Sequence, residues 1–174
     1  MEQAGYTFEI QVSQKEEIYK STEPDEVVKE LALLKAEDIA GQNEQRNLIV
    51  IGADTVVAHR GKILGKPKND ADAFAMIQGI QGEVHFVYTG IAILSFDEEG
   101  NKTVVNRAVG TKVFVDEMTE EEIRAYLATG EHCDKAGSYA IQGKFAPYIE
   151  KIEGDYYNVV GLPISYIRKA LKNL

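Results

Sequence analysis

The chain has 174 residues, 44% of them hydrophobic and 27% charged, which is typical of one globular domain with a sizeable core. Its net charge of -9 disfavours binding to a nucleic acid polymer, because proteins that bind phosphate backbones present basic surfaces. No apolar run approaches the roughly 18 residues of a membrane span, and no signal peptide opens the chain, so a cytoplasmic protein without a membrane partner is expected.

The first two elements expected along the chain are a strand and a helix. Phe8, Ile10 and Val12 alternate with polar residues, which is the pattern of a half-buried strand. Apolar residues then recur at helical spacing over residues 24–41, and the serine and threonine at residues 21–22 can cap this helix. The start of the chain therefore predicts a strand followed by a long helix with one apolar face.

A hairpin and a short helix are expected next. The run of strand-forming residues at 48–51 predicts a buried strand, and Arg60-Gly61 has the composition of a hairpin turn. Asn69 can cap a short helix that closes between residues 79 and 82, where glycines end the apolar pattern. These elements precede two long strands.

Two long strands and two helices are expected in the rest of the chain. The strands cover residues 84–96 and 103–115, and the turn-rich connection between them suggests an antiparallel pair. Thr119 and Glu122 have the spacing of a capping box for the next helix, and Pro163 begins the last one. Because helices and strands are interleaved, the expected fold class is α/β, a single domain with a mixed twisted sheet flanked by helices.

A carboxylate, Asp54, follows the strand-forming run after Gly52-Ala53. An ionised acid beside a buried strand is costly unless it is paired, hydrogen-bonded, bound to a metal or exposed at a sheet edge where ligands bind. Asp54 can equally begin a turn, since aspartate is a common turn residue. The residues alone leave both interpretations open, and motifs farther along the chain favour the functional one.

Three further motifs combine charged residues with glycine, and two of them also contain proline. They are LGKP at residues 64–67, DKAGSYAIQG at 134–143 and EGDYYNVVGLP at 153–163. Together with GADT at 52–55, they resemble the motifs of the Maf family of nucleoside triphosphate pyrophosphatases, and the resemblance extends over nearly the whole chain. It implies the fold of Maf and inosine triphosphatase-like proteins, as a single Maf-like domain over residues 1–174.

The resemblance also implies an activity and the residues that carry it. Maf proteins cleave a nucleoside triphosphate to the nucleoside monophosphate and pyrophosphate. Asp54 matches the residue taken as the proton acceptor or metal-linked catalytic acid, Lys66 belongs to the phosphate-binding set, and Glu17 matches a glutamate that follows the first strand. Thr55 and Gln142 lie where the pyrimidine-preferring branch carries its specificity residues, so dTTP, UTP or modified pyrimidine nucleotides are the expected substrates.

Elementary chemistry agrees with these roles. Hydrolysis of a triphosphate requires positive charge beside the phosphates and a water nucleophile, and carboxylates that hold a divalent cation, Mg²⁺ or Mn²⁺, can provide both. Glu17 and Asp54 are therefore the expected metal ligands, and Asp155 is a further candidate carboxylate. Asp134 and Lys135 are expected to bind substrate, Lys135 through a phosphate.

Two residues of the chain have a structural interpretation besides a functional one. The amide of Gln142 offers donors and an acceptor that can match the imide edge of thymine or uracil, but its place between Ile141 and Gly143 is equally that of a turn residue. Cys133, the single cysteine, lies beside Asp134 and can be a nucleophile. A lone cysteine without an obvious partner base is nevertheless expected to be a packing residue.

One part of the family pattern has no counterpart in these residues. Maf proteins usually begin with an apolar strand and a Ser-x-Ser-Pro-Arg-Arg-like loop that contacts the triphosphate, so relative to the family this domain is expected to be truncated at its N-terminus. Loss of a bidentate arginine predicts weak activity. The alternative to an enzyme is a catalytically impaired nucleotide-binding or cell-division (septum) regulatory module. The family also suggests a homodimer.

Overall fold

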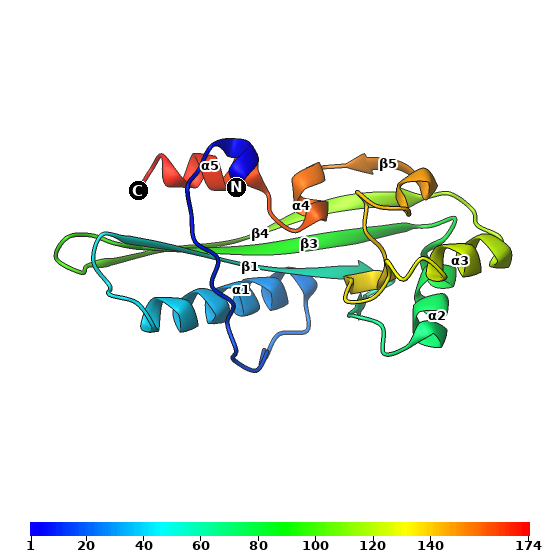
Figure 1. The fold of residues 1–174 in the computed structure, drawn as a ribbon, viewed down its shortest axis with the longest axis horizontal. Coiled ribbons are helices and arrows are strands. Elements are labelled where there is room, and N and C mark those ends of the chain that lie inside the picture. The colour runs from blue at the N-terminus through cyan, green and yellow to red at the C-terminus, as the bar shows by residue number, and fades with distance from the viewer. The chain divides into compact units, whose positions relative to one another are not determined.

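In the described part of the chain, five strands form one sheet in the order β2-β1-β3-β4-β5 (Figure 1). The computed structural model describes residues 1–174, with the exception of the side chain of Gln3. The strands are β1 (Leu48–His59), β2 (Lys62–Leu64), β3 (Val84–Phe96), β4 (Lys102–Val115) and β5 (Ile149–Glu153). The helices are α1 (Pro24–Gly41), α2 (Asp70–Ile80), α3 (Glu120–Leu127), α4 (Tyr156–Val160) and α5 (Ile164–Leu171), with short 3-10 turns at Glu2–Ala4, Ala136–Ser138 and Ala146–Tyr148.

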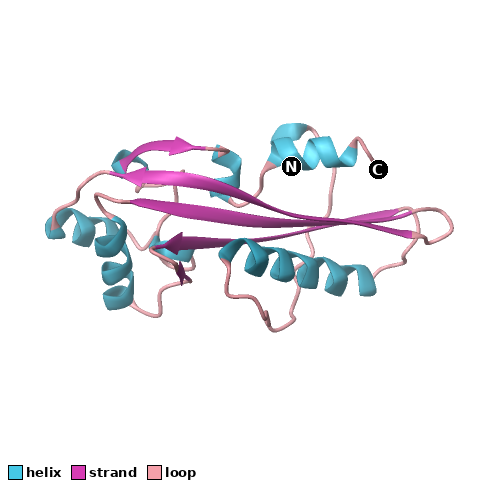
Figure 2. Ribbon diagram, turned by 180° about the vertical axis from the view of Figure 1, so that it is seen from behind, coloured by secondary structure: helices cyan, strands magenta, loops and turns pink.

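Neighbouring strands of the sheet run in opposite directions (Figure 2). β1 turns into β2 through Arg60 and Gly61, whose φ angles of 49° and 74° suit a tight two-residue hairpin. The turn from β3 to β4 is closed by the carboxylate of Asp97, which accepts hydrogen bonds from backbone N–H groups of the turn. The α/β class is confirmed, but the expectation of a mixed sheet is wrong, because α2 does not return the chain along the sheet and a parallel pair needs such a crossover.

Two compact units divide the chain, and the three long strands contribute residues to both. Unit 1 contains Met1–Asp54, Thr89–Val109 and Gly161–Leu174. Unit 2 contains Thr55–Tyr88 and Gly110–Val160. The expectation of a single domain is not tested by this division and stays a prediction.

The core of unit 1 lies on both faces of its strands. On one face, small residues of α1 pack with Val50 and Leu94. On the other face, Ile91 and Ile93 pack with Ile167 of α5. Helices therefore cover both faces of β3 in this unit, which explains why its sequence is a continuous apolar run and does not alternate with polar residues.

Two glycines let the strands of unit 1 lie directly against α1. A Cβ atom on Gly52 would overlap the carbonyl oxygen of Ala32, and one on Gly90 would overlap the carbonyl oxygen of Val28. Only a residue without a side chain fits at either position. Gly52 therefore serves the close packing of a strand on a helix and does not end the strand.

β1 is longer than its sequence pattern predicts. The expected strand covered residues 48–51, whereas β1 continues to His59 and contains Asp54 in its interior. The interpretation of Asp54 as the start of a turn is therefore wrong. Alternation along the strand places Asp54 on the same face as Val50 and Gly52, which is the face that α1 covers.

The segment over residues 8–12 is not a strand, although its alternating pattern predicts one. Phe8, Ile10 and Val12 are 41%, 81% and 72% exposed. A strand requires a neighbour that pairs with its backbone, and none of the strands in the described sheet pairs with this segment. The prediction of a half-buried strand is therefore wrong here.

The core of unit 2 is centred on Phe145, which has no exposed surface. Its ring lies 5.0 Å from that of Tyr126 in α3, 4.8 Å from that of Tyr139 and 5.6 Å from that of Tyr148, measured between centroids. These aromatic contacts tie α3 to the chain that follows it, including the DKAGSYAIQG segment.

The predicted starts of α2, α3 and α5 are confirmed, but the expectation that residues 21–22 cap α1 is wrong, because Glu23 is its N-cap residue and no side chain caps this helix. Asn69 caps α2 by accepting a hydrogen bond from the backbone N–H of Asp72. Thr119 and Glu122 form the expected capping box of α3, and Pro163 directly precedes α5. None of the helices in the described residues combines the length and the apolar character needed to cross a membrane.

Candidate active site

Lys35 of α1 joins two of the predicted site carboxylates in unit 1. Its Nζ lies 2.5 Å from Asp54 Oδ1 and 2.8 Å from Glu17 Oε1. The side chain of Asp54 is 12% exposed, whereas that of Glu17 is 57% exposed. The structure therefore brings Asp54 and Glu17 together through a residue that the sequence motifs did not reveal.

Helical spacing explains the position of Lys35. It lies four residues after Leu31 and seven after Val28, both of which are buried, so it shares the face of α1 that covers the sheet. A cation on the buried face of a helix needs an anionic partner, and Asp54 on the facing strand is one. A lysine at a position where the helical spacing predicts an apolar residue is the signal by which the sequence could have indicated the role of Lys35.

Burial disfavours the charged form of Lys35, but hydrogen bonds to Asp54 and Glu17 outweigh this effect and raise the pKa of Lys35 above its usual value. Lys35 is therefore an ammonium at neutral pH and cannot accept a proton from water. It can hold both carboxylates in place and offer positive charge to an anion. Within this cluster, proton acceptance belongs to the carboxylates.

An open pocket of about 720 Å³ lies beside this cluster, within unit 1. Glu17 and Lys35 line it together with residues of the N-terminal segment, α1 and β1. Much of its wall is apolar and includes Phe8, Ile10 and Ile49. A pocket with an apolar wall and a few convergent charged groups is typical of a small-molecule site.

Glu17 and Asp54 fit a divalent cation as part of its ligand set. Both carboxylates contact the same ammonium, so they are close enough to share one cation. Among the residues that the structure describes, no group of three histidine, cysteine, aspartate or glutamate side chains is arranged to hold a metal. Mg²⁺ commonly takes one or two carboxylates and completes its shell with water and substrate phosphates. The donor set therefore suits a cation that is bound together with a phosphate-bearing ligand.

In unit 2, the backbones of the two lysine-bearing motifs are joined. The N–H of Gly137 donates a hydrogen bond to the carbonyl of Gly65, with an N–O distance of 3.1 Å. Gly65 precedes Lys66 and Gly137 follows Lys135 by two residues, and both lysines are exposed. Gly137 has a φ of 67° and lies against Val57, so glycine meets both a conformational and a steric requirement there.

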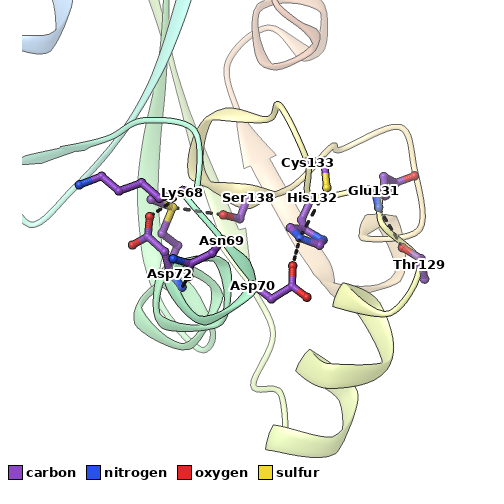
Figure 3. A network of polar contacts seen from close by, with 10 residues as sticks. Lys68, Asn69, Asp70, Asp72, Thr129, Glu131, His132, Cys133 and Ser138 are labelled. Atoms are coloured by element: carbon purple, nitrogen blue, oxygen red, sulfur yellow. Dashed lines mark hydrogen bonds and ion pairs between the residues drawn. The ribbon is translucent and has the colours of Figure 1, made fainter.

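The backbone of the DKAG segment is strained at two residues. Asp134 and Ser138 have φ angles of 60° and 65°, in the left-handed region that residues other than glycine rarely adopt. Asp134 is exposed, whereas Ser138 is fully buried and donates a hydrogen bond to the sulfur of Met76 at 3.1 Å (Figure 3). Strain of this kind persists where the surroundings enforce it, and it is frequent at ligand sites.

The two predicted specificity residues differ in exposure. Thr55 is half-buried in β1, whereas Gln142 is exposed in a turn. Ile141 and Phe145, 8% and 0% exposed, flank this turn. The turn interpretation of Gln142 is therefore confirmed, and it is compatible with base recognition because an exposed amide can present its donors and acceptor to a ligand.

Asp155 and Cys133 lie in other environments than the sequence analysis predicted. Asp155 Oδ1 accepts a hydrogen bond from the N–H of Tyr157 at 2.8 Å, so its carboxylate caps α4. Cys133 is exposed, and the expectation of a packing residue is wrong. Its Sγ lies 3.7 Å from Nε2 of His132, and the same nitrogen lies 3.1 Å from Asp70 Oδ1 (Figure 3). Because thiol and carboxylate approach one ring nitrogen, they do not form a relay through the imidazole.

Comparison with known proteins identifies relatives of this chain. A dTTP/UTP pyrophosphatase of Bacillus cereus is 49% identical over 173 residues, which are 99% of this chain and 82% of that protein. A protein of the same name from Alkaliphilus metalliredigens is 48% identical over 165 residues, 94% of this chain and 83% of the relative. Another, from Lachnoclostridium phytofermentans, is 45% identical over 172 residues, 99% of this chain and 87% of the relative.

The family model described as Maf-like protein matches residues 1–174. This match covers all four motifs on which the family resemblance was based, and the resemblance is confirmed. With relatives of such similarity over nearly its full length, this chain belongs to the Maf-like protein family.

Proposed function

We propose that this protein hydrolyses dTTP and UTP to the nucleoside monophosphates and pyrophosphate. The observation that carries the proposal is the cluster of Lys35, Glu17 and Asp54 beside the pocket of unit 1. It combines a proton acceptor, a fixed positive charge and two oxygen-donor carboxylates, the groups that hydrolysis of a phosphoanhydride needs. The dTTP/UTP pyrophosphatases to which the chain is similar support the choice of substrate.

In this mechanism Asp54 accepts a proton from the attacking water. Asp54 is the anionic partner of Lys35, whose Nζ lies 2.5 Å from its Oδ1, and a carboxylate anion is the form that can accept a proton. The water oxygen forms a bond to the alpha phosphorus. The bond from this phosphorus to the oxygen that bridges to the beta phosphate breaks, and pyrophosphate leaves with that oxygen. A carboxylate that is already held by an ammonium is oriented before the reaction, so less entropy is lost when the substrate binds.

Glu17 and Asp54 would hold a divalent cation, Mg²⁺ or Mn²⁺, together with the triphosphate. Such a cation, when bound, polarises phosphate oxygens and lowers the pKa of coordinated water. Lys35 supports this arrangement because it keeps the two carboxylates next to each other.

The residues of unit 2 bind phosphates and the base in this proposal. Lys66 and Lys135 are exposed cations on segments joined by the hydrogen bond between Gly137 and Gly65, and flexible lysines suit phosphates as point charges. Gln142 reads the imide edge of the pyrimidine through its amide. These roles explain why the motifs carry two lysines and an exposed amide.

The test is pyrophosphate release from a panel of nucleoside triphosphates with Mg²⁺ or Mn²⁺, together with nucleotide binding by calorimetry. We expect release from dTTP and UTP to exceed release from the other nucleotides. Asp54→Asn should lower kcat by roughly 10²–10⁴-fold, because a positioned base contributes that much to proton transfer. Asp116→Asn, at an exposed aspartate, serves as the matched control and should leave kcat unchanged.

Two outcomes would contradict the proposal. Nucleotide binding without pyrophosphate release would favour a binding or regulatory module instead of an enzyme. Release at the wild-type rate from Asp54→Asn would show that this carboxylate is not the proton acceptor.

A further inference from the structure

The turn that carries Gln142 is anchored at both ends and exposed in its middle. Ile141 and Phe145 are buried, whereas Gln142 and Lys144 are exposed. Within the turn, the N–H of Gly143 donates to the carbonyl of Ala140 at 3.1 Å. These contacts fix the ends of the turn but leave the middle, where Gln142 projects, dependent on further support.

Glu131 supplies a contact to the middle of this turn. Its Oε2 accepts a hydrogen bond from the backbone N–H of Lys144 at 2.7 Å. A bond from a backbone N–H to an ionised carboxylate is stronger than one between neutral groups. The carboxylate of Glu131 therefore restrains the backbone two residues after Gln142.

Gly143 allows the carboxylate to reach that position. A Cβ atom at residue 143 would overlap the carboxylate of Glu131, so the carboxylate lies directly against the Cα of Gly143. The backbone of Gly143 is not in the left-handed region, and an alanine there meets no conformational penalty. Gly143→Ala is consequently a steric probe that displaces the end of the Glu131 side chain without straining the turn.

The end of α3 fixes the base of Glu131. Its own N–H donates to Oγ1 of Thr129 at 3.3 Å (Figure 3), and Gly130 between them has a φ of 72°, which turns the chain after the C-cap Ala128. The negative charge of Glu131 also acts on a core residue, Tyr126. The pKa of Tyr126 is raised above its usual value, mainly by burial and secondly by this charge. The backbone of Glu131 is thus held by Thr129, and its carboxylate faces the turn of Gln142.

We infer that Glu131 is a positioning residue that sets the orientation of Gln142 and thereby the preference for the pyrimidine imide edge. Glu131 does not contact the base. It acts through the backbone of Gly143 and Lys144, and the inference rests on the proposed function of Gln142. A displacement of the amide by about 1 Å would suffice, since misplacements of that size can reduce a rate by about 10²-fold.

The test compares kcat and KM for UTP and CTP in the wild type, Glu131→Ala, Glu131→Gln and Gly143→Ala. Cytosine presents a different edge, so the ratio of kcat/KM for UTP to that for CTP measures how well Gln142 is placed. We expect Glu131→Ala to lower this ratio roughly tenfold, mainly through KM for UTP, because one hydrogen-bonded contact to the base is disturbed.

The conservative variant and the steric variant separate this role from a general effect on folding. Glu131→Gln keeps an oxygen that can accept from Lys144 and should retain most of the ratio. Gly143→Ala should lower the ratio as Glu131→Ala does, and the double variant should be no worse than either, because both remove the same contact. Glu98→Ala and Gly79→Ala, at an exposed glutamate and at a glycine with open space around it, are the matched controls.

Hydrogen exchange of the Lys144 amide gives a readout that does not depend on turnover. It should be faster in Glu131→Ala and in Gly143→Ala than in the wild type, because the N–H has lost its acceptor. The inference would be overturned if the Lys144 amide exchanged at the wild-type rate in these variants. It would also be overturned if the wild type preferred UTP to CTP and the variants kept the same ratio of kcat/KM. A wild type without pyrimidine selectivity would instead contradict the proposed function, while faster exchange would still support the contact itself.

Discussion

Lys35 forms ion pairs with two carboxylates in unit 1. Its ammonium contacts Asp54, which is largely buried, and Glu17, which is largely exposed. A complete ion pair of this kind contributes little net stability, but removal of one partner leaves the other charge desolvated. The residue therefore has a structural effect and, under the proposed function, a catalytic one.

Lys35→Met removes the charge and keeps most of the apolar stem. We expect it to lower the free energy of unfolding by roughly 1–3 kcal/mol, because the largely buried carboxylate of Asp54 loses a charged hydrogen-bond partner. Pyrophosphate release should fall roughly 10²–10³-fold, the effect of losing one preorganised electrostatic contact. Urea unfolding and the pyrophosphate assay measure the two effects. Lys62→Met, at an exposed lysine of β2, is the control, and an unchanged rate in Lys35→Met would contradict the assignment.

His85 predicts a specific loss of stability in acid. It is fully buried, and its Nε2 lies 2.7 Å from the hydroxyl of Tyr139. The pKa of His85 is lowered to about 4, mainly by burial and secondly by the charge of His59. The unfolded chain, with an ordinary histidine pKa of about 6.5, binds the proton more readily. Stability should therefore fall by about 3 kcal/mol as the pH drops from about 6.5 to about 4.

The double variant His85→Leu with Tyr139→Phe removes both partners of this bond and should flatten the stability profile in that pH range. Carboxylates with lowered pKa values, such as Glu83 and Asp97, lose their contribution to stability at lower pH. They are present in both the wild type and the double variant, so they do not account for a difference between the two. Urea unfolding at several pH values measures the difference. An equal slope in wild type and variant between pH 4 and 6.5 would rule out His85 as its cause.

At the scale of elements, the ends of helices were more predictable than the ends of strands. Caps are local, so Asn69 and the Thr119–Glu122 box marked α2 and α3 from sequence alone. Strands depend on partners that sequence does not show, and the alternating residues 8–12 accordingly formed none. β5 and α4 were not predicted at all, because they lie in the glycine-rich segment of residues 137–161, whose apolar residues have no clear periodicity.

The packing of β1 and β3 on α1 yields a prediction at this scale. Gly52→Ala and Gly90→Ala place a Cβ atom into the carbonyl oxygens of Ala32 and Val28, which belong to a helix backbone and cannot rotate away. We expect each to lower the free energy of unfolding by roughly 1–3 kcal/mol or more, as overpacking of a core does. Urea unfolding measures the change.

Gly79→Ala is the matched control for this pair. Gly79 lies in α2 with open space where its Cβ would be, so alanine should stabilise the protein by roughly 1 kcal/mol through helix propensity. Wild-type stability in Gly52→Ala would show that β1 does not lie against α1 as closely as described.

For the whole molecule, the four motifs indicated the family and most of the candidate site residues, but not how these residues contact one another. Lys35 was missed because it lies outside every motif and acquires its role only when α1 packs on β1. Glu131 was missed for the same reason, since its contact to the turn of Gln142 depends on the end of α3. Residues that hold others in place are defined by tertiary contacts, which a single sequence does not record.

The net charge of -9 is a further property of the whole chain. A molecule with this charge repels a nucleotide anion at long range, so under the proposed function nucleotide binding depends on local cations such as Lys66 and Lys135. Sequence composition disfavoured a nucleic acid polymer as partner and left room for a small anionic ligand, which the proposed function requires.

The exposed thiol of Cys133 gives this molecule a built-in attachment point for a reporter group. It is the single cysteine of the chain, so a maleimide dye would label one position without any substitution. That position directly precedes Asp134 and Lys135, in the segment whose backbone contacts the LGKP motif. The fluorescence of one dye could therefore follow events in this segment in real time, in the wild-type protein and in every variant described above.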